Sequence, residues 1–180
     1  MARSVVHRSE FSTAKRPRSR VAGPYGHPFH PMLVTLPIGA FVSSIVFDLF
    51  TLPGGRAYLV DGAYWLLGVG LIGALVAAVF GLLDLLAIPR RTHAFRVGIT
   101  HLALNVIALA VFAASFAWRS TDHLDIDKTR IGQLVLSAVA LAVLGVSGWL
   151  GGELAYHYGV RVADEATQQE GFDQEAIHDR

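Results

Sequence analysis

The sequence contains no cysteine. Disulfide bonds, thiolate-bound metals and cysteine-ligated iron–sulfur clusters are therefore excluded for this chain, and any metal ion would have to bind histidine, carboxylate or carbonyl groups. Hydrolase motifs are also lacking. There is no HExxH segment and no glycine-rich phosphate loop, and the segment GVSGW at 145–149 lacks the second glycine of a nucleophile elbow. A hydrolase is not expected, whereas a redox role stays open.

Charged residues are scarce. They make up 16% of the 180 residues, against 53% hydrophobic residues, and the mean hydropathy is +0.46. Most of them lie outside four apolar runs, at about 32–50, 63–88, 97–118 and 131–156. A helix needs roughly 20 apolar residues to cross a hydrocarbon core of about 30 Å. The sequence therefore predicts an all-α, integral membrane four-helix bundle over residues 23–161, with a kink at Pro37 in the first span.

The distribution of lysine and arginine predicts the orientation of the chain. Eleven of the 15 lie in the amino-terminal arm, the second loop and the carboxyl-terminal tail, and four lie on the opposite side. The positive-inside rule therefore places both termini in the cytoplasm. Residues 1–22 form a basic arm that we expect to be disordered near anionic lipid, with no nucleic acid bound. The acidic tail at 162–180 has too little apolar content to fold alone.

Ionisable side chains inside the predicted spans mark a candidate site. Each costs at least about 2.5 kcal/mol to insert into a membrane, so such residues usually face the bundle interior and have a function. At a helical rise of about 1.5 Å per residue, those of this chain fall at a similar depth, near the cytoplasmic surface. The candidate ligands are His30, His101, His157, Asp84 and Glu153, with His27 and Asn105 as supporting residues.

An internal symmetry places similar residues in this layer. The first predicted hairpin begins at His30 and ends near Asp84. The second begins at His101 and ends near Glu153, so the separations are 54 and 52 residues. Two further pairs match in register, Leu33 with Leu104 and Phe41 with Phe112. The pattern predicts two repeated helical hairpins, related by an axis along the membrane normal.

Each candidate ligand also has an interpretation that needs no cofactor. His101 could form hydrogen bonds with Asp84 or Glu153 that hold the helices together, a contribution of about 0.6 kcal/mol on average in membranes. His157 could extend to the interface, and Asp84 could pair with an arginine at 90–91.

Several other polar or small residues receive structural interpretations. Asp48 and Asp61, at the outer ends of the first two spans, are expected to be boundary or capping residues, and the loop residue His123 is assigned no role. Gly148 and Gly152 stand in GxxxG spacing, which we interpret first as close helix packing and second as room for a flat cofactor.

A set of short motifs covers most of the chain. They are GHPFHP at 26–31, LPIG at 36–39, GLLD at 81–84, SGWLGGE at 147–153 and HYGV at 157–160, together with Asp48, His101 and Asn105. Over about residues 23–161, this set resembles a bacterial membrane family catalogued as domain of unknown function 2231. The resemblance implies the bacterial cytoplasmic membrane but no established activity. Some relatives are joined to a Rieske-type iron–sulfur domain, which hints at electron transfer with a partner that would here be a separate protein.

The leading functional hypothesis is a membrane redox or metal-binding protein. Two of the three histidines His30, His101 and His157 would ligate a b-type haem or a single metal ion, with Asp84 and Glu153 fixing the imidazole tautomers. For a non-haem ion, histidine with carboxylate favours iron, zinc or manganese over Cu(I). Room for a macrocycle would come from Gly81, Gly148, Gly151 and Gly152.

Two alternatives belong to other functional classes. One is a structural or partner-recruiting membrane module without a cofactor, as a single chain or a homo-oligomer. The other is a proton-linked transporter, which ranks lowest because the polar layer lies on one side only, with no acidic residue in mid-membrane.

Overall fold

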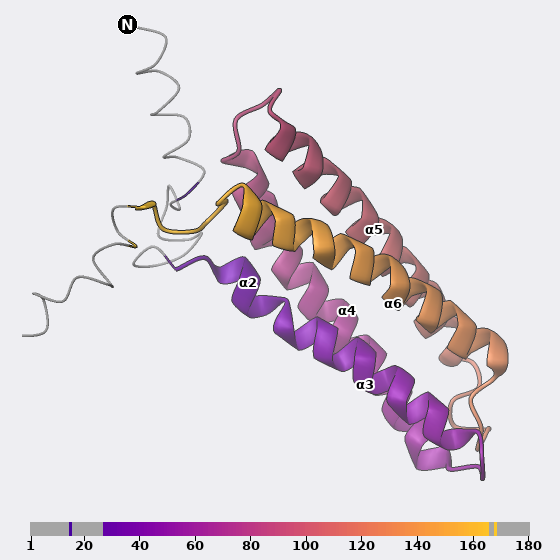
Figure 1. Cartoon of the computed structure of the whole chain (residues 1–180). Helices are drawn as coiled ribbons and strands as arrows, with labels where there is room; N and C mark the ends of the chain where they lie inside the picture. Colours follow the sequence, from indigo (N-terminus) through magenta and orange to yellow (C-terminus); the bar gives the residue numbers. More distant parts are fainter. Residues whose placement is uncertain (1–14, 16–26, 166–167, 169–180) are drawn as a thin grey trace, which may run out of the picture.

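Four long helical spans lie side by side in the computed structural model, which describes Lys15, residues 27–165 and Gln168 (Figure 1). Apart from Lys15, the predicted basic arm lies outside the described residues, as does most of the acidic tail. The helices are α2 (Phe29–Leu33), α3 (Thr35–Thr51), α4 (Ala57–Leu86), α5 (His93–Arg119), α6 (Ile131–Gly152) and the π-helix η2 (Glu153–His157). They form spans of 23, 30, 27 and 27 residues, each long and apolar enough to cross a membrane. The predicted all-α membrane class is confirmed.

The helices extend beyond the predicted apolar runs. The second span begins at Ala57 where position 63 was predicted, and the third begins at His93 where 97 was predicted. Hydropathy detects the part of a helix that fits the hydrocarbon core, whereas the helix itself continues through the polar interface. At the start of α5 the Thr92 side chain accepts a hydrogen bond from Phe95 N over 3.1 Å, which caps the helix.

The first span is interrupted at Val34, between α2 and α3. Pro37 lies three residues further along, lacks an N–H group and cannot donate to the carbonyl of Leu33. The chain stays coiled across the interruption, because Val34 N donates to His30 O over 3.1 Å and Ile38 N donates to Val34 O over 3.2 Å. This local irregularity agrees with the effect predicted for Pro37.

Two helical hairpins make up the bundle: α3 packs along α4, and α5 packs along α6. Phe41 and Phe112, one from each hairpin, stack in the core with their ring centroids 3.8 Å and their planes 5° apart. Leu67 and Ala140 complete this fully buried cluster. A β-carbon at Gly70 would lie 2.5 Å from Phe41 Cε1, so the ring occupies space that only glycine leaves free.

Equivalent residues of the two hairpins lie 70 or 71 positions apart in the sequence. The turn that follows α4 and the turn that follows η2 each hold an arginine in the left-handed region, Arg91 with φ 67° and Arg161 with φ 60°. Non-glycine residues rarely adopt this conformation, so its presence at matching positions supports the predicted repeat. The equivalent pairs are His30 with His101, Phe41 with Phe112, Ser44 with Ser115, Gly81 with Gly151, and Arg91 with Arg161.

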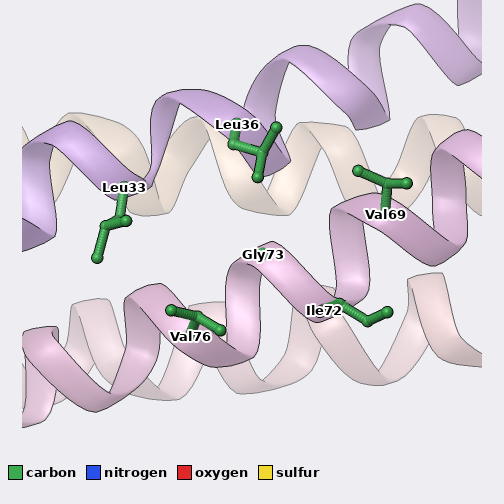
Figure 2. A pocket seen from close by; sticks show the side chains of 6 residues that line it. All are labelled: Leu33, Leu36, Val69, Ile72, Gly73 and Val76. Carbon is green, nitrogen blue, oxygen red and sulfur yellow. The ribbon is translucent and has the colours of Figure 1, made fainter.

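The two ends of the bundle are chemically different. At one end of the bundle, α2 and α5 begin and α4 and η2 end; we call it the terminal end (Figure 1). The connections 52–56 and 120–130 lie at the opposite end, which we call the loop end. Between them, an apolar groove of about 240 Å³ runs along α2, α3 and α4, lined by Leu33, Leu36, Val69, Ile72, Gly73 and Val76 (Figure 2). The groove contains no histidine or carboxylate, so it is separate from the candidate ligands.

Candidate functional site

His30 lies in the first turn of α2 and packs against α4. Its Nδ1 lies 2.8 Å from Ala77 O. A carbonyl oxygen can only accept, so Nδ1 donates, and Nε2 holds the lone pair when the imidazole is neutral. A β-carbon at Gly81 would lie 2.8 Å from His30 Cε1, so Gly81 leaves the space that this ring occupies.

His101, on α5, makes the equivalent contacts with α6. Its Nδ1 donates to Ser147 O over 2.7 Å, and Ser147 Oγ donates to His101 O over 3.0 Å. Asn105 Nδ2 lies 3.1 Å from His101 Nε2 and donates to it, so both ring nitrogens have partners. A β-carbon at Gly151 would lie 3.1 Å from His101 Cε1. Each hairpin therefore places an imidazole against a glycine and anchors it to a backbone carbonyl.

The structure brings His30 and His101 together at the terminal end. Their ring centroids are 6.4 Å apart, and the ring planes meet at 88°. Asp84 lies three residues beyond Gly81 on α4, the glycine that His30 packs against. Of the predicted ligands, these three share one neighbourhood.

The partner of Asp84 is an arginine that the sequence had not suggested. Arg161 Nε donates to Asp84 Oδ1 over 2.7 Å, with side-chain exposures of only 4% for Arg161 and 12% for Asp84. The pairing predicted with an arginine at 90–91 is wrong, because the left-handed turn after η2 carries Arg161 back across the end of α4. Among the described residues, buried Arg161 Nη1 has no hydrogen-bond acceptor.

The other predicted ligands have separate surroundings. Glu153 accepts a hydrogen bond of 3.0 Å from the Tyr158 hydroxyl. Desolvation, and then the hydrogen bond and negative charge of Glu153, raise the pKa of Tyr158, which keeps this hydroxyl a donor at neutral pH. His157 is exposed, with its ring centroid 4.7 Å from that of Tyr158, and His27 is exposed as well.

The interpretation of the glycines also changes. Gly81 and Gly151 hold imidazole rings, so this space is not left for a macrocycle. A β-carbon at Gly148 would meet nothing within 4 Å, and one at Gly152 would meet only Tyr156 Cδ2, at 4.0 Å. Within the described part of this chain, no neighbouring helix packs against the two glycines, so their GxxxG spacing stays a prediction of packing against another chain. In that same part, no three His, Asp or Glu side chains are grouped as ligands of one metal ion.

A second polar layer, at the loop end, centres on Asp48 and Arg119. Arg119 Nη1 donates to Asp48 Oδ1 over 2.7 Å, and Nη2 donates to Oδ2 over 2.6 Å. Both residues are fully buried. Thr129 Oγ1 adds a hydrogen bond of 2.8 Å to Asp48 Oδ1, and Arg119 also donates to the hydroxyls of Ser115 and Ser137. This layer ties α3, α5, α6 and the 120–130 connection together.

Sequence reasoning missed this ion pair. Asp48 was interpreted as a boundary residue, and Arg119 was only counted among the four cations on the opposite side of the membrane. The repeat contained a usable signal, because Asp48 and Arg119 are 71 positions apart and therefore occupy equivalent places in the two hairpins. Equivalent residues such as Phe41 and Phe112 meet between the hairpins, and opposite charges at such positions can pair there.

The fold and these two layers define a multi-pass membrane protein built from two related helical hairpins. The chain belongs to the family described as "Predicted membrane protein (DUF2231)", whose profile matches residues 26–164. This confirms the resemblance found in the motifs. No curated protein and no solved structure matches the chain.

Proposed function

We propose that this membrane protein binds a transition-metal ion between His30 and His101 and takes part in membrane electron transfer. The observation that supports the proposal is the approach of two imidazoles from equivalent positions, with ring centroids 6.4 Å apart. Two imidazoles that ligate one tetrahedral ion through nitrogens at about 2.0–2.1 Å have their ring centroids about 5 Å apart, so binding would draw these two rings together by about 1 Å. A redox-active ion there would exchange one electron with a separate partner, such as a Rieske-type protein.

The hydrogen bonds at Nδ1 support the same proposal. Histidines that bind metals usually donate their second nitrogen to a carbonyl or carboxylate, which fixes the tautomer and aims the ligating nitrogen. His30 and His101 both donate Nδ1–H to a backbone carbonyl, which leaves Nε2 for the ion. Asn105 would have to turn away from His101 Nε2, and Asp84 would supply a carboxylate near His30. This donor set favours zinc, iron or manganese, of which iron and manganese could exchange the electron and zinc could not.

We favour a single ion over b-type haem, because imidazole rings fill the space beside Gly81 and Gly151. We place the site on the cytoplasmic side of a bacterial inner membrane, since the flanking segments hold eleven of the 15 lysines and arginines. The surrounding lipid bilayer follows from the four apolar spans.

Elemental analysis and absorption spectra of the purified protein test the proposal. The wild type should carry about one metal ion per chain, with little absorbance in the Soret region. His30→Ala and His101→Ala should lose the ion, and His157→Ala, an exposed matched control, should keep it. A Soret band would show that the bound cofactor is haem and not a single metal ion. An absence of both metal and Soret band in protein purified without chelator contradicts metal binding altogether.

A cofactor-free structural module is the second candidate, and one observation favours it. Both nitrogens of His101 already have protein partners, in Ser147 and Asn105. If the layer only holds helices together, His101→Ala will lower the unfolding temperature while spectra and metal content stay unchanged. The transporter hypothesis gains no support, because the apolar cluster around Phe41 and Phe112 separates the two polar layers.

A further inference from the structure

His123, which the sequence left without a role, lies between two hydrogen-bond acceptors at the loop end. It belongs to the 120–130 connection, and its side chain is 13% exposed. Its Nδ1 lies 3.2 Å from the carbonyl oxygen of Arg119, at the end of α5. Its Nε2 lies 3.6 Å from Asp61 Oδ1, in the second turn of α4.

Neither neutral form of the imidazole fits these surroundings. With the hydrogen on Nδ1, the Nε2 lone pair faces the Asp61 carboxylate. With the hydrogen on Nε2, the Nδ1 lone pair faces a carbonyl oxygen. Only the doubly protonated ring offers a donor to each acceptor. Asp61 Oδ1 is buried and has no hydrogen-bond donor within 3.5 Å among the described residues, so His123 is the group placed to supply one.

The ring contacts are compatible with the charged form. The ring of Tyr64, from α4, stacks on His123 with centroids 3.9 Å apart and planes 28° apart, and Phe116 stacks on the far side of Tyr64 at 4.5 Å. A cation over an aromatic face is stabilised by the ring's quadrupole.

Two charged residues next to His123 are already paired. Arg119 directs its guanidinium to Asp48, and Asp122 accepts hydrogen bonds from Arg130 and Gln133. Asp125, Asp127 and Lys128 belong to the same connection, but among the described residues Asp61 is the carboxylate that lies within 4 Å of a His123 ring nitrogen.

We infer that His123 and Asp61 form a pH-sensitive link that fastens the 120–130 connection to α4. While His123 carries both protons, the ring joins the carbonyl of α5 to the carboxylate of α4. As the pH rises and the imidazole releases a proton, one acceptor loses its donor and the connection loosens. The link is thus present at lower pH and lost at higher pH.

A spin label on the connection tests this link. The chain has no native cysteine, so Leu124→Cys, at a side chain 75% exposed, gives a single labelling site. In nanodiscs the label should become more mobile between about pH 5 and about pH 8. His93→Gln, at the terminal end, should respond like the wild type.

Two variants at Asp61 distinguish the link from general loosening. Asp61→Ala should leave the label mobile at both pH values. Asp61→Asn should keep it restrained at the higher pH, because the amide can donate to the neutral Nε2. A label whose mobility is the same at both pH values in the wild type, or that still responds to pH in Asp61→Ala, overturns the inference.

Discussion

The two polar layers of this bundle differ in how fully their hydrogen-bonding capacity is used. At the loop end, both oxygens of Asp48 accept from Arg119, and Thr129 adds a third donor. At the terminal end, Arg161 Nη1 has no acceptor among the described residues, and none of their donors bonds to His30 Nε2. The Asp48–Arg119 pair is saturated by its own neighbours, whereas, of the residues described at the terminal end, only His101 has partners at both ring nitrogens.

The contrast separates a structural role from a binding role. A buried charge pair with every oxygen bonded holds helices in register and leaves nothing for a ligand to do. A buried donor without an acceptor costs free energy that folding alone does not recover. We therefore attribute stability to the Asp48–Arg119 layer, while ligand binding at the His30–His101 layer is the proposal made above, and the predictions below test that division.

The largest expected effect is the loss of one partner from the saturated layer. Asp48→Ala leaves the buried Arg119 charge without its carboxylate, and the free energy of unfolding should fall by about 3–5 kcal/mol. Denaturation in detergent micelles, followed by the fluorescence of the three tryptophans, measures this loss. The double variant Asp48→Leu with Arg119→Met removes both charges and should recover most of the stability. A double variant no more stable than Asp48→Ala contradicts the argument.

The next effect concerns Arg161 at the unsaturated end. Arg161→Leu removes the donor that holds Asp84, so the free energy of unfolding should fall by about 1.5–3 kcal/mol, the range for hydrogen bonds to charged groups. Arg91 is the matched control, because it occupies the equivalent left-handed position in the first hairpin but is exposed. Arg91→Leu should change stability little. Equal losses in the two variants would show that the turn matters and the ion pair does not.

The sequence predicted the helices better than the partners of their polar side chains. Long apolar runs are a local property, so four spans could be found without tertiary information. His30 and His101 stood out because an imidazole inside an apolar run is costly. Asp48 and Arg119 did not stand out in the sequence, because each lies near the end of a span, where a charge can reach water.

The partner of Asp84 was hidden for a different reason. Arg161 is 77 residues away in the sequence, and its direction depends on a positive φ in the turn after η2. Neither property has a signal in composition or spacing. The ion pair therefore became visible only once the hairpins were packed.

A smaller effect should follow from filling the space beside His30. A β-carbon at Gly81 would lie 2.8 Å from His30 Cε1, whereas one at Gly148 would meet nothing within 4 Å. Gly81→Ala should therefore displace the imidazole and lower the free energy of unfolding by about 1–2 kcal/mol, as overpacking does. It should also reduce metal content. Gly148→Ala is the control and should leave both quantities unchanged; a similar response in the two variants would remove the packing argument.

The smallest expected effect concerns the affinity of the terminal layer for its proposed metal ion. Asn105 donates to His101 Nε2, the nitrogen that a metal ion would need. Asn105→Ala removes this competitor, so the affinity for Zn²⁺ should rise by roughly fivefold, the equivalent of one neutral hydrogen bond of about 1 kcal/mol. Competition with a chromophoric chelator measures it. The same substitution in a His101→Ala background should have no effect. Weaker binding by Asn105→Ala would mean that Asn105 assists the ion, and that the terminal layer holds its ligand with an amide as well as two imidazoles.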